Sequence, residues 1–579
     1  MRLLIAVVIH CSLAGQVLAA EPTLIVHNGK IVTVDEAFSI AEAMAVDGDK
    51  IVAVGSNDDV LKLAGPKTER LDLAGKTVLP GLIDSHVHPL GAAMYEFDHP
   101  IPEMETVADV LTYIARRAEL LPDGAWIKLQ QVFITRLRDQ RYPTRAELDR
   151  AAPKNPVVFR TGPDASLNSL ALEGSGIDKA FQITDGGPGQ VERDPETGEP
   201  TGILRGCTRL IQDKPSDREA TRDDRDRRIK ELFAAYNRAG ITSISDRGAT
   251  EESLDLYRRL REQGELTCRV SAQHTISPLA PQEQLVAEVE KLASHPLRGD
   301  DSMLRLIGIK VWLDGGMLTG SAYMNEPWGV SDIYSITDPA YRGMLLIPPD
   351  RMELIARLAI EHGLQPTAHS VGDGAVTTLV GVYEKIAKEL PIRKLRPCVT
   401  HSNFMTAEAI AKMKQLGIVA DLQPAWLYLD GATLRKQFGD ERLTWFQPYK
   451  TLFDEGIIVG GGSDHMQKLG ARRSINPYDP FLGMWITLTR QPRRTDEPLH
   501  PEQSLSREQA LRLYTINNAY LTFEEHRKGS LEPGKLADFL IVDRDILTCP
   551  VDDVKDTQVA RTYLGGKMVY QAEQEAGSE

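Results

Sequence analysis

The chain has 579 residues, 42% of them hydrophobic, with 67 Lys and Arg against 82 Asp and Glu and a formal net charge of -15. This length exceeds one ordinary hydrophobic core, and this composition excludes a disordered or low-complexity protein. The negative charge argues against a nucleic-acid-binding protein, because such proteins present basic surfaces to phosphates. The interior of the chain also has no apolar stretch long enough to span a bilayer.

Residues 1–20 have the features of an export signal. Arg2 precedes a short apolar run, and Val17 and Ala19 provide residues for a cleavage site. The alternative is a buried N-terminal strand. We expect a cleaved signal peptide, and therefore a periplasmic or secreted protein.

Two β-rich segments lie at opposite ends of the chain, at residues 24–55 and 537–570. Both alternate apolar and polar residues, and turn signals such as Asn28-Gly29 and Asp47-Gly48 interrupt them. Two half-sheets so far apart in sequence complete one domain only by pairing with each other. We therefore predict a composite β-sandwich domain formed by residues 21–77 and 525–579.

Between these segments, short apolar runs alternate with amphipathic helical patterns. This alternation predicts a (β/α)8 TIM barrel over residues 78–524, because parallel strands need crossover connections. A long insertion, residues 90–221, follows the first barrel strand and is expected to arch over the barrel mouth as a lid. The eight strand-like runs are Val78–Ser85, Ile241–Asp246, Cys268–His274, Leu304–Leu313, Leu364–His369, Pro397–His401, Ile418–Gln423 and Ile457–Asp464.

Several of these runs end in polar side chains of the types that bind metals. His86 and His88 are two apart in a strand, so both imidazoles point the same way. His369, His401 and Asp464 each end another run, and barrel strands end at the face where active sites form. Four histidines and a carboxylate there suit a borderline divalent cation, with zinc expected. Separate hydrogen-bonded residues at the barrel rim are the alternative.

Lys310 lies within the apolar run Leu306–Leu313, where an uncompensated ammonium would be costly. A lysine so buried has a depressed pKa and reacts as a neutral amine. Carbon dioxide could convert it to a carbamate whose two oxygens bridge a pair of cations. The alternative is an ion pair with Asp314.

Several motifs of the chain resemble one protein family. They include GLIDSHVH (Gly81–His88), the stretch Tyr142–Phe159, GIKVWLDGG (Gly308–Gly316), AHSVGDGAV (Ala368–Val376) and GSLEPGKLADFLIVD (Gly529–Asp543). Over essentially the whole mature chain they resemble the amidohydrolase superfamily, in particular its amidohydrolase-3 branch, which includes N-substituted formamide deformylase and YtcJ-like proteins.

The resemblance implies a barrel with a composite β domain and one or two divalent cations. It implies His86, His88, His369 and His401 as metal ligands, Lys310 as a carboxylated bridge, and Asp464 as ligand and catalytic acid/base. Many relatives dimerise, so a homodimer is left open.

The insertion departs from the pattern of the branch. An Asn-Ser-x-Ala-Leu stretch is retained from Asn168, but the Asp-Gly-His that usually precedes it reads Thr161-Gly162-Pro163 here. The metal set is intact, so the departure concerns substrate specificity. We predict Asn168, Trp312 and Gln423 as substrate-binding residues; packing is the alternative for Trp312.

These features predict an exported metal-dependent amidohydrolase that acts on a C–N bond of a small amide, formamide or cyclic amide. A divalent cation lowers the pKa of water and so supplies hydroxide at neutral pH. Asp464 would accept the water proton and return it to the leaving nitrogen. An ester, lactone or carbamate hydrolase would use the same groups. A non-catalytic binding protein on a barrel scaffold is a third reading, but it predicts loss of ligands, and none is lost.

Overall fold

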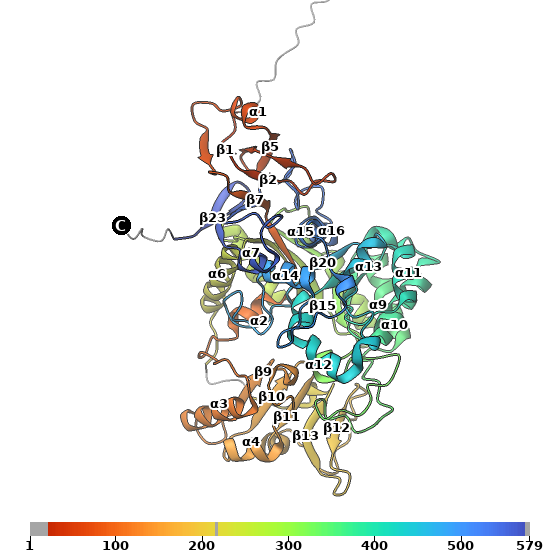
Figure 1. Ribbon diagram of the computed structural model, residues 1–579. Coiled ribbons are helices and arrows are strands. Elements are labelled where there is room, and N and C mark those ends of the chain that lie inside the picture. Colours follow the sequence, from red (N-terminus) through yellow and green to blue (C-terminus); the bar gives the residue numbers. More distant parts are fainter. Residues whose placement is uncertain (1–20, 215–217, 574–579) are drawn as a thin grey trace, which may run out of the picture.

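An eight-stranded parallel sheet forms the centre of the protein (Figure 1). The computed structural model describes residues 21–214 and 218–573. The strands follow one another in chain order: β8 (Leu82–Val87), β14 (Ile241–Ala249), β15 (Arg269–Thr275), β16 (Leu304–Trp312), β17 (Gln365–Ser370), β18 (Cys398–His401), β19 (Val419–Leu422) and β20 (Val459–Gly461).

Backbone hydrogen bonds join the last strand to the first. The amide of Asp464 donates to the His86 carbonyl at 2.8 Å, and the amide of His88 donates to the His465 carbonyl at 2.8 Å. The sheet is therefore nearly closed at its C-terminal end, and the predicted (β/α)8 fold is confirmed.

Amphipathic helices cover the barrel, and capping side chains fix where several of them begin. Thr221 and Thr250 both form capping boxes, which satisfy free amides of the first turn. The barrel helices include α6 (Arg222–Arg238), α7 (Glu251–Gln263), α8 (Gln282–Ala293), α9 (Pro349–Glu361), α10 (Asp373–Ala387), α11 (Ala407–Leu416), α15 (Arg507–Leu513) and α16 (Ile516–Leu521). Non-helical backbone at Thr515 separates α15 from α16.

The first predicted barrel run belongs to two sheets. Its beginning is β7 (Thr77–Pro80), a strand of the composite β domain, and only β8 enters the barrel. Gly81 lies between the two strands. Glycine is required there because a Cβ would lie 2.3 Å from the Thr242 hydroxyl.

The composite β domain contains two sheets, and strands from both ends of the chain meet in one of them. Phe539–Val542 (β21) pairs antiparallel with β7, so the N-terminal and C-terminal segments share a sheet. Side chains of both sheets form one apolar core. The sheets are β5-β4-β1-β6 (Lys50–Gly55, Ala43–Asp47, Leu24–His27, Glu69–Asp72) and β23-β22-β21-β7-β2-β3, in which β23 is Lys567–Gln571, β22 Val559–Leu564, β2 Lys30–Val32 and β3 Ile40–Ala41.

A buried ion pair connects this domain to the bottom of the barrel. The Arg269 guanidinium at the start of β15 donates to both oxygens of Asp538, with Nε–Oδ2 at 2.6 Å and Nη2–Oδ1 at 2.8 Å. Both side chains are 4% exposed.

The insertion forms a separate five-stranded sheet on the opposite side of the barrel from the composite domain (Figure 1). Buried Arg205 joins it to the loop after β16, donating to the backbone carbonyls of Thr319 and Tyr334. The elements of the insertion are α3 (Val107–Leu120), β9 (Ile127–Gln130), α4 (Arg145–Ala151), β10 (Val157–Thr161), β11 (Asp164–Leu167), α5 (Ser169–Gly174), β12 (Gln190–Arg193) and β13 (Pro200–Arg205).

No helix among the described residues has the length and apolar character needed to cross a membrane. The predicted signal peptide, residues 1–20, lies outside the described part of the chain.

Candidate metal centre

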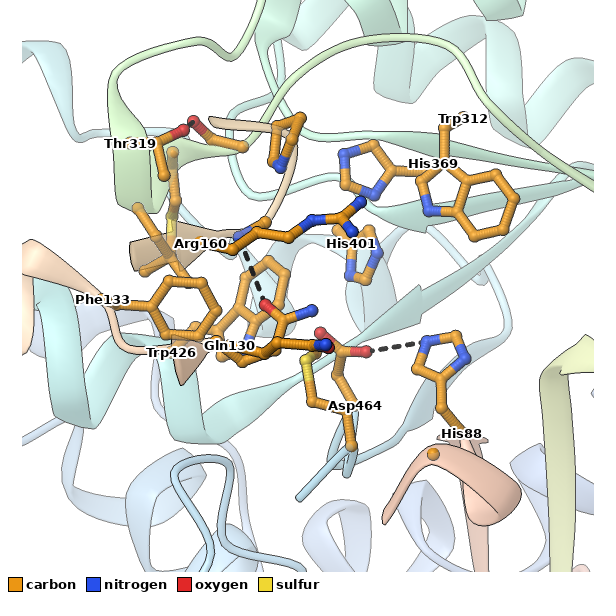
Figure 2. A pocket seen from close by; sticks show the side chains of 18 of the residues that line it. His88, Gln130, Phe133, Arg160, Trp312, Thr319, His369, His401, Trp426 and Asp464 are labelled. Atoms are coloured by element: carbon orange, nitrogen blue, oxygen red, sulfur yellow. Dashed lines mark hydrogen bonds and ion pairs between the residues drawn. The ribbon is translucent and has the colours of Figure 1, made fainter. Parts of the chain in front are cut away.

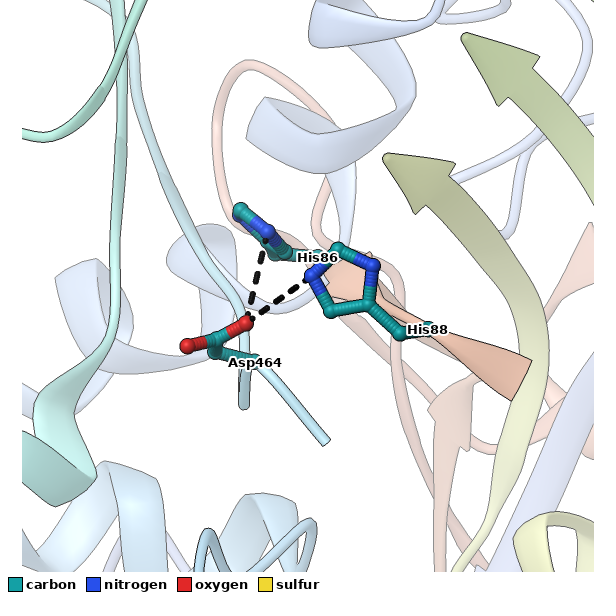
Figure 3. A group of neighbouring side chains, drawn as sticks. All are labelled: His86, His88 and Asp464. Atoms are coloured by element: carbon teal, nitrogen blue, oxygen red, sulfur yellow. Dashed lines mark ion pairs between the residues drawn. The ribbon is translucent and has the colours of Figure 1, made fainter. Parts of the chain in front are cut away.

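The C-terminal ends of the barrel strands bring the predicted ligands together. His86 and His88 belong to the end of β8, and Asp464 follows β20, the neighbouring strand across the closure. Oδ1 of Asp464 lies 3.5 Å from Nε2 of His86 and 3.2 Å from Nε2 of His88 (Figure 3). One ligand atom from each residue lies within 4.8 Å of the others, so the three side chains could hold one cation.

The other two histidines extend this group. The ring centroids of His86 and His401 are 4.8 Å apart, and those of His401 and His369 are 4.5 Å apart. The four imidazoles therefore form one continuous cluster across β8, β17 and β18.

Hydrogen bonds orient three of these rings. Nδ1 of His86 lies 2.8 Å from Oδ2 of Asp421, and Nδ1 of His401 lies 2.6 Å from Oε1 of Gln423. Because these oxygens accept, each Nδ1 carries the proton and each Nε2 keeps its lone pair. Nε2 of His369 lies 3.2 Å from the Gly315 carbonyl, which leaves Nδ1 of that ring free.

Gln423 was predicted to bind substrate, and the structure gives it another contact. Its side chain is fully buried and accepts from His401, while its Nε2 faces the Asp421 carbonyl at 3.3 Å. It therefore orients a histidine of the cluster instead of facing the cavity.

The buried rings are uncharged. Burial, followed by the positive charge of Lys310, lowers the pKa of His369 to about 3. Burial also holds the pKa values of His86 and His401 well below the ordinary histidine value. Neutral imidazole is the form that binds a metal, so these rings need no deprotonation at neutral pH.

Lys310 lies beneath the histidines with its side chain fully buried. Its Nζ has no hydrogen-bond partner among the described residues. Burial and then the Arg247 guanidinium lower its pKa to about 7. The alternative pairing with Asp314 does not occur, because Asp314 accepts instead from the backbone amides of Tyr323, Val371 and Gly372.

The backbone at two of these positions is unusual. His401 has φ 69° and Asp464 has φ 55°, in the left-handed region that non-glycine residues rarely adopt. Asn476 supports the second position by donating to the Asp464 carbonyl at 2.7 Å. Such strained conformations are concentrated at functional sites.

The cluster opens into a cavity of about 510 Å³, a volume typical of small-molecule sites. His88, His369, His401 and Asp464 form its floor (Figure 2). Its walls contain aromatic side chains of the barrel and insertion, with Trp426 stacked on His401 at 4.7 Å. The insertion contributes Gln130, Gln131, Phe133, Arg160, Gly162 and Pro163, and the barrel loops contribute Trp312, Asp314, Met317, Leu318 and Thr319.

Of the other two predicted substrate-binding residues, Trp312 faces the cavity and Asn168 does not. Trp312 lines the cavity and is 39% exposed. Asn168 does not reach the cavity. Its buried side chain caps α5 by accepting from the Ala171 amide and also accepts from the Val157 amide. This position gives Asn168 a structural role inside the insertion, in place of the predicted substrate contact.

Three residues of the site were not predicted from the sequence. They are Asp421, Arg160 and, as a residue of the cavity, Asp314. Asp421 had a signal, because it is a carboxylate inside the apolar run 418–423, where an unpaired charge would be costly. Arg160 had none, because only the tertiary position of the insertion directs it toward the barrel.

Comparisons with known proteins agree with this geometry. The model of the amidohydrolase family matches residues 69–570. The chain is 29% identical over 565 residues to N-substituted formamide deformylase of Arthrobacter pascens, covering 95% of this chain and 98% of that protein. It is 25% identical to the putative amidohydrolase YtcJ of Bacillus subtilis over 560 residues, covering 94% and 99%.

Among solved structures, the fold is similar to that of an uncharacterized metal-dependent hydrolase from Pyrococcus horikoshii. The TM-score is 0.65 at 22% identity, covering 91% of this chain and 99% of that one.

Proposed function

The chain belongs to the amidohydrolase family, and we propose that it is an exported metal-dependent hydrolase that cleaves the C–N bond of a small amide, formamide or cyclic amide. The observation that carries the proposal is the convergence of the histidines and Asp464 on the floor of an aromatic-lined cavity. The relative named N-substituted formamide deformylase supports the choice of a C–N bond.

The residues present fit a divalent cation. Nε2 of His86 is buried without a hydrogen-bond partner in the described structure, yet Asp421 holds its ring in one tautomer. An unpaired buried nitrogen is costly unless something binds it. His86, His88, His369, His401 and Asp464 would hold the metal, with zinc as the expected ion because it favours nitrogen and carboxylate ligands.

When bound, the metal supplies Lewis acidity and makes water acidic enough to react at neutral pH. Asp464 performs the proton transfers, since its carboxylate lies at the cavity floor. It accepts the proton of the attacking water and then delivers it to the leaving nitrogen, which departs as a neutral amine.

Lys310 completes the site as a carbamate. Its Nζ is buried and unpartnered among the described groups, so a neutral amine is favoured there. The amine adds to carbon dioxide, forming an N–C bond and releasing one proton. The resulting carboxylate places negative charge among four histidines and gives the site two further oxygen donors for a second cation.

Export rests on residues 1–20 of the sequence. The test is N-terminal sequencing of the mature protein from separated periplasmic and cytoplasmic fractions. Cleavage near residue 20 and recovery outside the cytoplasm are expected, and an intact N-terminus inside the cytoplasm would contradict export.

The reaction is tested with purified protein of known metal content. N-formyl, N-acyl and cyclic amides are compared with esters of the same acyl and aryl groups, before and after chelation. We expect amine release from at least one amide class, loss on chelation and recovery with Zn²⁺. Cleavage of esters alone would contradict C–N specificity, and full activity in metal-free protein would contradict the metal centre.

A further inference from the structure

Arg160, at the end of β10, is the one Lys or Arg side chain among the described residues that line the cavity. Figure 2 shows it extending from its strand across the cavity toward the histidine cluster. Its Nη2 donates to the Thr208 hydroxyl at 3.2 Å, and no carboxylate of the described residues lies within ion-pair distance of it. Desolvation lowers the pKa of this guanidinium, and Asp213, which counteracts that shift, is paired with Lys128 at 2.9 Å.

The acidic groups of the cavity are already engaged. Asp314 accepts three backbone amides, and Asp464 faces His86 and His88. Arg160 is therefore the cation of this cavity that has no ion-pair partner in the described structure, since nearby Asp213 is paired with Lys128. A guanidinium that lines a ligand cavity favours an anionic ligand, because a carboxylate accepts two parallel N–H donors from it.

A neighbouring groove has the same sign of charge. It shares Tyr95 and Phe133 with the cavity, and seven Lys and Arg side chains line it against two glutamates. Lys468 and Arg494 are among these cations, and no ion pair holds either of them in the described part of the chain. Ion pairs with carboxylates hold the other five cations, so Lys468 and Arg494 are the charges of this groove that would attract an anion.

We infer that the substrate is a carboxylate-bearing amide, such as an N-acyl or N-formyl amino acid, whose carboxylate binds Arg160. The inference rests on the proposed function for the reaction itself and adds the chemical class of the substrate. The scissile amide lies at the histidine cluster, and the carboxylate pairs with the guanidinium. The side chain of the substrate packs against Phe133, Trp312 and Trp426, which line the same cavity.

The inference assigns substrate specificity to the insertion. Arg160 lies at the end of β10, Gly162 and Pro163 form the turn to β11, and all three line the cavity. This is the turn where the sequence reads Thr161-Gly162-Pro163 in place of the Asp-Gly-His of the branch it resembles. The chain thus presents a cation beside a turn that has lost an imidazole.

The test compares two formamides that differ only in the carboxylate: N-formylphenylalanine and N-formylphenethylamine. Each is assayed with the wild-type holoenzyme and with Arg160→Gln, which removes the charge. Arg209→Gln is the matched control, because Arg209 belongs to the same insertion, pairs with Asp185 at 2.7 Å and does not line the cavity. Arg160→Lys and Arg160→Met provide further variants with and without charge.

We expect the wild type to prefer N-formylphenylalanine by about tenfold or more in kcat/KM, mainly through KM, as a charge-assisted pair would give. The preference should disappear in Arg160→Gln and Arg160→Met, return in part in Arg160→Lys and persist in Arg209→Gln. In the control Arg209→Gln, hydrolysis of both formamides should match the wild type. An undiminished preference in Arg160→Gln, or a wild type that favours the neutral compound, would overturn the inference.

Calorimetric binding of the same two compounds separates this inference from the proposed reaction. If neither is hydrolysed, tighter binding of N-formylphenylalanine that Arg160→Gln alone abolishes would support the carboxylate site while the proposed reaction fails. Equal binding of the two compounds, or binding of neither, would remove Arg160 as the specificity residue.

Discussion

Nδ1 of His86 lies 2.8 Å from Oδ2 of Asp421, and both side chains are fully buried. Asp421 also accepts from the Ser85 hydroxyl at 2.5 Å and pairs with Arg247 at 3.0 Å. A carboxylate behind a ligand histidine fixes its tautomer and increases its basicity. Asp421 is therefore a positioning residue for the proposed metal site.

We expect Asp421→Asn to weaken metal affinity by about 10- to 100-fold, the usual effect of losing such a partner. Metal-buffered titrations with activity and metal content as paired readouts would measure this effect. Ser85→Ala is the control, since it removes one hydrogen bond to Asp421 but leaves its charge opposite His86. Equal metal affinity in wild type and Asp421→Asn would contradict the assignment.

Asp464→Asn should lower kcat by about 10²- to 10⁴-fold, because an amide neither accepts nor returns the proton. Its shape is retained, so the thermal midpoint should change little. Steady-state hydrolysis of the amide identified by the substrate panel, with metal content measured on the same sample, checks this outcome. Asp223→Asn, in the first turn of α6, is a control far from the site. Activity close to that of the control would remove Asp464 from the proton-transfer role.

Lys310→Gln tests the proposed carbamate. When protein is reconstituted with Zn²⁺ in ¹³C-labelled bicarbonate, the wild type should show a carbamate carbon signal by NMR that the variant lacks. The variant should also bind fewer zinc ions, because Gln offers neither carbamate oxygen. Lys291→Gln, an exposed lysine on α8 paired with Glu251, is the matched control. A signal of equal intensity in Lys310→Gln would show that the labelled carbon is elsewhere.

The Arg269–Asp538 pair predicts a pH-dependent contribution to stability. Burial alone would raise the pKa of Asp538, but Arg269 and the Gly565 amide hold it below the ordinary value of 3.8. The folded state therefore binds this proton less tightly than the unfolded state does. The stabilisation is complete above pH 3.8 and is lost as the pH falls through the folded pKa.

Asp538→Asn should consequently destabilise the protein at pH 7 by about 3–5 kcal/mol, since it leaves a buried guanidinium without its counter-charge. The difference between wild type and variant should become smaller as the pH falls below 3.8 towards the lowered pKa of the folded state, where the wild-type carboxylate takes up its proton. Thermal midpoints of both proteins across this pH range provide the measurement. Asp59→Asn, in the exposed Asp59–Lys62 pair of the same domain, should change little at any pH. A constant difference across the range would contradict the linkage.

The sequence was sufficient to predict the barrel and the residues that meet at its rim. Each predicted ligand is a polar residue that ends an apolar run, and parallel strands place such ends at one edge. The residues that orient those ligands were harder to predict from the sequence. Gln423 ends a run in the same way as His401, so the pattern could not distinguish a residue facing the cavity from one facing a neighbouring ring.

The insertion was the least predictable part of the site. Asn168 stands in a stretch that suggested a substrate contact, but its hydrogen bonds satisfy the start of α5. Arg160 ends a strand of a different sheet, and its direction depends on how that sheet docks on the barrel. Local sequence patterns describe each element but do not determine how one sheet docks on another.

The position of β21 between β7 and β22 has a consequence for biosynthesis. The edge of β7 that β21 later covers emerges from the ribosome more than 450 residues before its partner. Until then that edge presents unpaired amides and carbonyls, which invite misassembly. The sheet that contains β7 is therefore completed only after β21 has been translated. A chaperone that shields the edge of β7 would act until then.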